Sequence, residues 1–139
     1  MKFHSETIEF PTNGFPEVVD LTDHVQSVLL NADVSNGLLT VFVPGSTAGV
    51  TTVEFEPGLL LDFRALCERL APLDAKYQHD QAWHDGNGYA HVLAALLKPS
   101  LSIPVGKGAP SLGNWQQVVL AEFDNRPRRR EVIIQVIGE

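Results

Sequence analysis

Three histidines and two aspartates lie within residues 77–91, YQHDQAWHDGNGYAH, in a chain that has five histidines in all. His79 and His91 are separated by twelve positions, with Asp85 midway, and imidazole and carboxylate groups of this kind bind zinc and other transition metals. The spacing matches no standard metal motif, such as two histidines at i and i+4 on one helix. The alternative is a polar loop in which His79 caps a turn and His84 faces solvent. The residue types indicate a metal or catalytic site, and the spacing leaves the choice open.

His91 has the most informative setting of the three histidines. It follows the Gly86-Asn87-Gly88 turn and lies near the start of the apolar stretch YAHVLAALL. An imidazole buried among apolar side chains costs free energy unless it is hydrogen-bonded. His91 therefore needs a partner, which is either a protein group, such as a backbone carbonyl, or a bound ligand.

Residues 45–52, GSTAGVTT, combine small side chains with hydroxyl groups. The backbone amides of such a stretch can approach an anion such as phosphate closely. It is not a Walker loop, because no Gly-Lys-Ser or Gly-Lys-Thr follows. Packing against a neighbouring subunit explains the small residues equally well. Glu54, just after this stretch, is a candidate acid or base if it faces the same cleft as His91, and otherwise an outward-facing strand residue.

Four of the ten basic residues gather in RPRRR, residues 126–130. They form either a local anion site or a solvated entrance to a strand, whose charges discourage edge-to-edge pairing. The net charge of −7 argues against a general nucleic-acid-binding protein, which needs an excess of Lys and Arg to release counterions from phosphates.

Hydrophobic patterning and turn residues predict three helices and six strands that position these groups. The last strand is apolar on both faces except at Gln135, so we expect it to be central in its sheet. The order β-α-ββ-αα-βββ favours an α+β fold, with a mixed sheet and helices on one face. Strands are expected over residues 1–10, 38–44, 49–57, 100–105, 114–123 and 130–138, and helices within 20–37, 58–73 and 89–100.

Composition sets the remaining bounds. A chain of 139 residues, 44% hydrophobic and 19% charged, is typical of one folded domain, here 1–139. Cys67 is the only cysteine, so no disulfide can form within the chain, and we expect it to be a packed thiol. No secretory signal opens the chain and no apolar run is long enough to cross a bilayer, so we expect a soluble cytoplasmic protein without a membrane partner.

Three longer segments, taken together, resemble a known family. They are STAGVTTVEFEPG, HDGNGYAHVLAALLKPSLSIPV and LGNWQQVVLAEFDNRPRRREVIIQVIGE, and they span much of the chain. An Ala-His near the start of a helix, a Pro-Ser-Leu-x-Ile-Pro-Val strand, a Leu-Gly-x-Trp-Gln turn and a terminal Gly-Glu are specific as a set. The chain resembles the YjbQ-like family, small proteins identified as secondary thiamine-phosphate synthases.

The resemblance implies an α+β subunit that associates as a homotrimer, with a polar cleft near the subunit boundary. It implies that a pyrimidine diphosphate is joined to a thiazole phosphate at this cleft, with a divalent metal ion (Zn, Mn or Mg) opposing the charge of the leaving group. The implied catalytic residues are His91, Glu54 and Asp85, and the implied metal ligands are His79, Asp85 and His91. The implied contacts to the phosphorylated substrate are Thr47, Thr51, Asn87, Trp115, Gln116, Arg128 and Arg130.

The chain departs from the family pattern at two positions. Gly45-Ser46-Thr47-Ala48 stands where many relatives carry His-Thr-Thr-Ala or His-Thr-Ser-Ala, which removes one imidazole. Asn114 stands where relatives usually carry Thr. Three hypotheses follow: a transferase or metal-assisted hydrolase acting on a phosphorylated small molecule, a trimeric protein that binds a metal or anion without turnover, and an interaction protein whose histidines are incidental.

Overall fold

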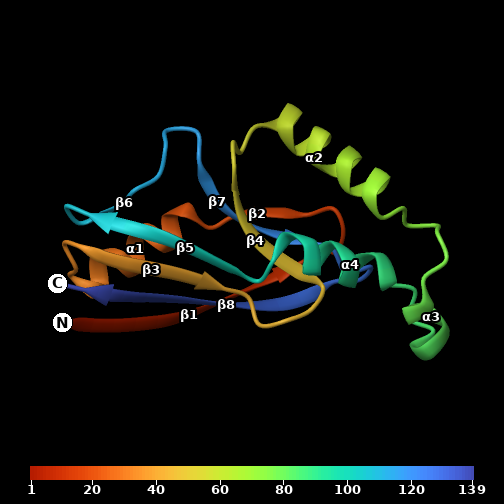
Figure 1. Ribbon diagram of the computed structural model, residues 1–139, viewed down its shortest axis with the longest axis horizontal. Coiled ribbons are helices and arrows are strands. Elements are labelled where there is room, and N and C mark those ends of the chain that lie inside the picture. Colours follow the sequence, from red (N-terminus) through yellow and green to blue (C-terminus); the bar gives the residue numbers. More distant parts are fainter.

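The first and last strands of the chain pair along their whole length (Figure 1). In the computed structural model, which describes all 139 residues, β1 (Lys2–Thr12) runs antiparallel to β8 (Arg128–Gly138). Val132, Ile134 and Val136 of β8 are buried at every second position. A slip of one residue would turn all three to solvent, so the apolar pattern specifies the register of this pair.

The strands form two sheets in which every pair is antiparallel. The five-stranded sheet has the order β1-β8-β3-β5-β6, with β3 (Gly37–Phe42), β5 (Ser100–Gly106) and β6 (Ala109–Pro110). The three-stranded sheet has the order β2-β7-β4, with β2 (Val18–Asp20), β7 (Gln117–Glu122) and β4 (Ala48–Val53).

The main core lies between the two sheets and α1 (Thr22–Ala32). Leu39 of β3, Ile134 of β8 and Leu120 of β7 are fully buried in it, together with Val25 of α1. Ala121 belongs instead to a second cluster, because successive side chains of a strand point to opposite faces. The three-stranded sheet is thus covered by the main core on one face and by helices on the other.

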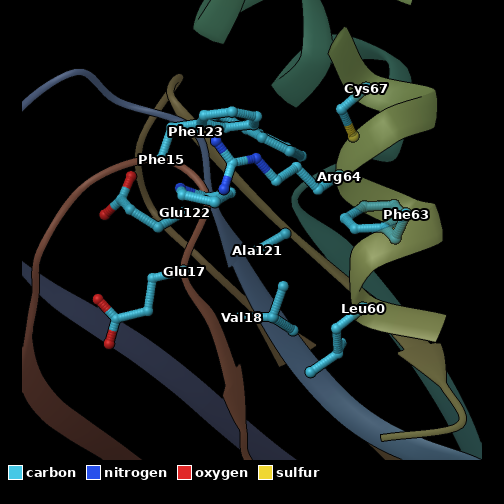
Figure 2. Close-up of a pocket in the computed structure, with 11 residues that line it drawn as sticks. Phe15, Glu17, Val18, Leu60, Phe63, Arg64, Cys67, Ala121, Glu122 and Phe123 are labelled. Carbon is cyan, nitrogen blue, oxygen red and sulfur yellow. The ribbon is translucent and has the colours of Figure 1, made fainter. Parts of the chain in front are cut away.

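Two of the helices supply that second cluster. They are α2 (Pro57–Leu70) and α4 (Gly88–Leu97), separated by the short α3 (Gln78–Trp83). Figure 2 shows Leu60, Phe63 and Cys67 of α2 facing Ala121 and Phe123 across a narrow crevice. Burial raises the pKa of the Cys67 thiol, with a smaller effect from the Glu68 carboxylate, which agrees with the expected packed thiol.

Only the inner edge of α2 is buried. The helix begins where the Glu56 carboxylate accepts hydrogen bonds from the amides of Gly58 at 2.8 Å and Leu59 at 2.7 Å. Cys67 is its one buried residue, whereas Leu61, Leu66 and Leu70 are 67%, 44% and 56% exposed. The apolar periodicity that predicts this helix therefore gives it a second apolar surface, which the single chain leaves uncovered.

The structure confirms an α+β fold and the central place of the last strand, which lies between β1 and β3. It differs from the expected architecture in detail, since the strands form two antiparallel sheets and not one mixed sheet. β2, α3 and β6 were not expected, and each has six residues or fewer, too short for a periodic pattern to emerge. None of the four helices combines the length and the apolar character needed to cross a bilayer.

Candidate functional site

The histidine-rich segment brings His79 and His91 into contact at the end of the molecule opposite both termini (Figure 1). α3 ends at His84, whose φ of 58° is left-handed, and the chain then turns through Gly86 into α4. The ring centroids of His79 and His91 are 4.3 Å apart with a tilt of 36°. His84 is exposed, as the polar-loop alternative expected, but the other two histidines form a cluster.

Two carboxylates lie beside His79. Asp80 Oδ1 is 3.4 Å and Asp85 Oδ1 is 3.6 Å from His79 Nδ1, and one ligand atom from each of the three residues falls within 4.8 Å of the others. Two ligands of a tetrahedral ion, with bonds of about 2.0–2.2 Å, lie about 3.3–3.6 Å apart. The spacing around His79 therefore fits a metal ion, and the nitrogen and oxygen donors suit zinc or manganese.

Asp80 is a candidate ligand that sequence reasoning missed, and the tertiary structure explains its orientation. Its Oδ1 accepts a hydrogen bond from the amide of Gly88 at 2.8 Å, which ties α3 to the start of α4. The only signal for it in the sequence is its position next to His79. His91 lies against His79, but its ring nitrogens are outside the group of three ligand atoms, so its role as a ligand stays a prediction.

His91 is half-buried and its pKa is lowered. Burial is the main cause, and the neighbouring His79 adds to it, while the carboxylates of Asp124, Asp85 and Asp80 act in the opposite direction. A lowered pKa keeps the ring neutral at neutral pH. Neutral imidazole has a lone pair with which to accept a proton or bind a metal ion.

A buried carboxylate, Asp124, connects this cluster to the strands. Its Oδ1 accepts hydrogen bonds from Asn87 Nδ2 at 3.3 Å and from the Asn125 amide at 2.8 Å, and its Oδ2 accepts one from Thr47 Oγ1 at 3.1 Å. Arg128 Nε lies 3.4 Å from Oδ2. Burial alone would raise the pKa of Asp124, but these hydrogen bonds and the Arg128 charge together lower it.

Asn87 has one polar atom left over. Its Oδ1 is the one buried side-chain nitrogen or oxygen in the chain that has no hydrogen-bond partner. A buried acceptor of this kind is costly unless a donor reaches it. Because this atom is buried, the substrate contact expected of Asn87 stays a prediction.

Arg130 and Glu122 form a buried ion pair beside Thr47. Arg130 donates from Nε to Glu122 Oε1 at 2.7 Å and from Nη2 to Glu122 Oε2 at 2.5 Å, and Nη2 also donates to Thr47 Oγ1 at 2.8 Å. Thr12 Oγ1 donates to Glu122 Oε1 at 2.6 Å. The interpretation of the arginines as a solvated strand entrance is therefore wrong for Arg130, whose side chain is 4% exposed, because a buried carboxylate is available to pair with it.

Two hollows flank the loop before β4. One, of about 230 Å³, is bordered by His91, Ser46 and Ala48, and the other, of about 300 Å³, by Arg128, Arg129 and Arg130. Gly45 borders both. The start of the small-residue stretch thus lies between His91 and the arginines. The sequence alone did not predict this arrangement.

Four expected site residues lie away from this cluster within one chain. Ala48 borders the His91 hollow, and Glu54 follows it by six positions along β4, which corresponds to about 20 Å of extended strand. Gln116 donates to Thr52 Oγ1 at 3.3 Å, so it belongs to that far end of β4 as well. Thr51 is half-buried on β4, and Trp115 is 73% exposed in the loop before β7.

Asp124 provides a test of this polar network by pH. Replacing it in the variant Asp124→Asn removes the charge that Arg128 and three hydrogen-bond donors stabilise, and we expect a loss of about 1–3 kcal/mol in the free energy of unfolding at pH 7. Because the folded-state pKa lies below the ordinary value of 3.8, this contribution is present above that value and is lost as the pH falls through the folded-state pKa.

Chemical denaturation of both proteins between pH 7 and pH 3 measures the difference. We expect the gap between native protein and variant to narrow only below about pH 4. Asp74→Asn, at an exposed position, is the control and should leave the stability unchanged. A variant as stable as the native protein at pH 7 would contradict the role given to Asp124.

The family model and the similar proteins all indicate the same family. The family model described as "UPF0047 protein YjbQ-like" matches residues 6–139. A UPF0047 protein of Methanothermobacter thermautotrophicus is 34% identical over 139 residues, covering 100% of this chain and 95% of that protein. One from Archaeoglobus fulgidus is 38% identical over 121 residues, covering 87% of this chain and 91% of its own length.

Solved structures agree with the fold. A protein of Sulfolobus solfataricus P2, described as a YbjQ-like protein of unknown function, superimposes with a TM-score of 0.89 at 27% identity, covering 99% of both chains. A hypothetical protein of Aeropyrum pernix K1 superimposes with a TM-score of 0.86 at 34% identity, covering 96% of this chain and 99% of that one.

Proposed function

The chain belongs to the UPF0047 family of YjbQ-like proteins, and from the geometry of its site we propose that it is a metal-assisted enzyme acting on a phosphorylated small molecule. The observation that carries the proposal is that one ligand atom from each of His79, Asp80 and Asp85 lies within 4.8 Å of the other two. Arginines lie across the neighbouring loop from this cluster, and Arg–phosphate pairs are among the strong charge-assisted contacts of proteins.

His79, Asp80 and Asp85 are the residues that would hold the metal ion. A divalent ion bound there would neutralise developing negative charge on a phosphate leaving group. The Gly88 amide orients Asp80 for this task, much as second contacts orient ligands in other metal sites. His91, kept neutral by burial, would accept a proton from an attacking water in a hydrolysis, or donate one hydrogen bond to the substrate in a transfer.

The specific reaction implied by the resemblance is a transfer. The thiazole nitrogen forms a bond to the pyrimidine methylene carbon as the bond from that carbon to the diphosphate oxygen breaks, giving thiamine phosphate and pyrophosphate. Arg128, whose side chain is one-third exposed, is the group of this chain that would position the substrate.

A second candidate is a protein that binds a metal or anion without turnover. Gly45 favours it, since the imidazole that the family pattern has at this position is absent from the chain. The two candidates share the metal site and differ in whether a bound substrate reacts there.

We also infer that the chain associates with copies of itself as a homotrimer, the state that the resemblance implies. Large apolar side chains are exposed on α2, and the β6–β7 loop, which contains the exposed Trp115, lies on the same side of the molecule as α2 (Figure 1). Contiguous apolar surfaces of this kind mark interaction sites. Association would also give Glu54 and Trp115 a route to the His91 cleft of a neighbouring copy, because they are remote from it within one chain.

Metal binding is measured by titrating Zn²⁺ or Mn²⁺ into the purified protein by calorimetry. We expect one strong site per chain, and at least a tenfold loss of affinity in His79→Ala and in Asp85→Asn, because each removes one ligand. His24→Ala, which removes an exposed histidine of α1, should bind the metal as the native protein does. Equal affinities in all four proteins would contradict the metal site.

Catalysis is measured as pyrophosphate release from the pyrimidine diphosphate and thiazole phosphate, and as phosphate release from a panel of phosphate esters. We expect His91→Gln to lower kcat by about 10²–10⁴, the range of general acid–base catalysis, with metal affinity largely retained. His84→Asn, at an exposed position, is the control. Absence of turnover on every substrate, together with intact metal binding, would favour the binding protein.

Association is measured by size-exclusion chromatography with light scattering. We expect a mass three times that of the 15.2 kDa chain, and a shift toward smaller species in Leu66→Glu, which places a charge on the exposed face of α2. Leu30→Glu, on the exposed face of α1, should leave the mass unchanged. A monomeric native protein would overturn the inference.

A further inference from the structure

The guanidinium group of Arg130 has one nitrogen that the buried ion pair does not use. Nε and Nη2 donate to Glu122 and Thr47, whereas Nη1 donates no hydrogen bond within the chain. The side chain is 4% exposed, so this charged group is otherwise enclosed. Nη1 itself is not among the buried atoms without a partner, so part of it is accessible to solvent, and Arg130 borders the hollow of about 300 Å³.

Gly45 borders that space. A Cβ atom built on Gly45 would lie 3.1 Å from Arg130 Nη1, so the missing side chain is what leaves the nitrogen uncovered. The φ of Gly45 is +151°, a conformation that residues with a side chain rarely adopt. The backbone thus holds a glycine at the point where a larger residue would cover the guanidinium.

Gly45 is also the residue that the two hollows share. On one side lies the hollow with His91 and Ser46, and on the other the hollow with Arg128, Arg129 and Arg130. Glu9 and Glu131 border the arginine hollow too, but Glu9 is already engaged by Arg129, whose Nη2 is 3.1 Å from Glu9 Oε2. Because carboxylates also border this hollow, an anion would be held there by the N–H groups of Nη1 more than by the net charge of the hollow.

We propose that Arg130 Nη1, uncovered at Gly45, is an anion subsite, and that the ligand of this protein carries two anionic groups, one at the metal cluster and one at Arg130. The second part rests on the proposed function, whereas the subsite does not need a metal. A phosphate oxygen is the acceptor best matched to a guanidinium N–H pair, since such bonds are charge-assisted on both sides.

The subsite is tested on the native protein without metal. Inorganic phosphate is titrated while the ¹⁵N resonances of the arginine side chains and the backbone amides are followed by NMR. We expect saturable shifts of the Arg130 side chain and of the Gly45 amide, with the amides of α1 unchanged. Shifts confined to exposed Arg129, or none, would overturn the subsite.

The two-anion ligand is tested on Mn²⁺-loaded protein with alkane bisphosphonates of increasing length and their monophosphonate counterparts. We expect one spacer length to bind at least tenfold more tightly than its monophosphonate, and Gly45→Ala to remove that gain by placing a methyl group against Nη1. Gly106→Ala, whose added methyl group would meet no atom nearer than Ser111 Oγ at 3.8 Å, is the matched control and should retain it. Equal affinity of mono- and bisphosphonates in the native protein would overturn the two-anion ligand.

Separate readouts keep the two proposals apart. If Mn²⁺ fails to bind while phosphate still shifts Arg130, the metal-assisted function fails and the subsite stands. If Mn²⁺ binds and phosphate leaves Arg130 unchanged, the subsite fails and the metal site stands. Should Gly45→Ala not fold, the phosphate titration and the bisphosphonate series on native protein decide the proposal without it.

Discussion

The burial of the Arg130 charge is the constraint on which the arrangement of this end of the molecule depends. A guanidinium removed from water is stable only where a carboxylate and hydrogen-bond acceptors replace the lost hydration. Glu122 of β7 supplies the carboxylate, and Thr47, just before β4, supplies a hydroxyl oxygen. Thr12 of β1 satisfies Glu122 in turn, so one ion pair joins strands from both sheets. Removing either partner alone would leave an uncompensated buried charge.

This ion pair also determines where the candidate site lies. Thr47 is shared between Arg130 and Asp124, and Asp124 in turn holds Asn87 at the start of the helix that carries His91. The network therefore connects the arginines of β8 to the histidine of α4 through buried hydrogen bonds. A site assembled on strands and a helix end is more rigid than one carried by a free loop. His79, Asp80 and Asp85 meet this framework from the outside, where they remain accessible.

The face of the three-stranded sheet that α2 and α4 cover is less completely buried than the face on the main core. α2 covers it through the row of Leu60, Phe63 and Cys67 (Figure 2), whereas Leu61, Leu66 and Leu70 are exposed. An amphipathic helix normally gains its stability by burying its apolar face. Within one chain α2 buries only part of that face, which is why the proposed function links self-association to the completeness of the site.

Periodicity was enough to predict most of the fold. Apolar residues lie on both faces of β8 and recur at three and four in α2, and both elements form where these patterns predict them. The α+β class, the central last strand and the proximity of His79 to His91 were all predictable, the last because only twelve positions and a Gly-Asn-Gly turn separate them. Local residue patterns are enough to predict contacts between residues that are close together in the chain.

The tertiary structure alone decided the rest. Asp124 and Glu122 read as ordinary residues at the end of a strand, and their importance arises from partners more than seventy positions away, Thr47 and Thr12. The burial of Arg130 could not be read from RPRRR, because burial of a charge depends on whether a distant carboxylate meets it. The position of Gly45 next to Arg130 Nη1 is likewise decided by the tertiary structure, since the two residues are far apart in the chain. Long-range pairing determines which polar groups lose water, and a single sequence does not contain that information in any local pattern.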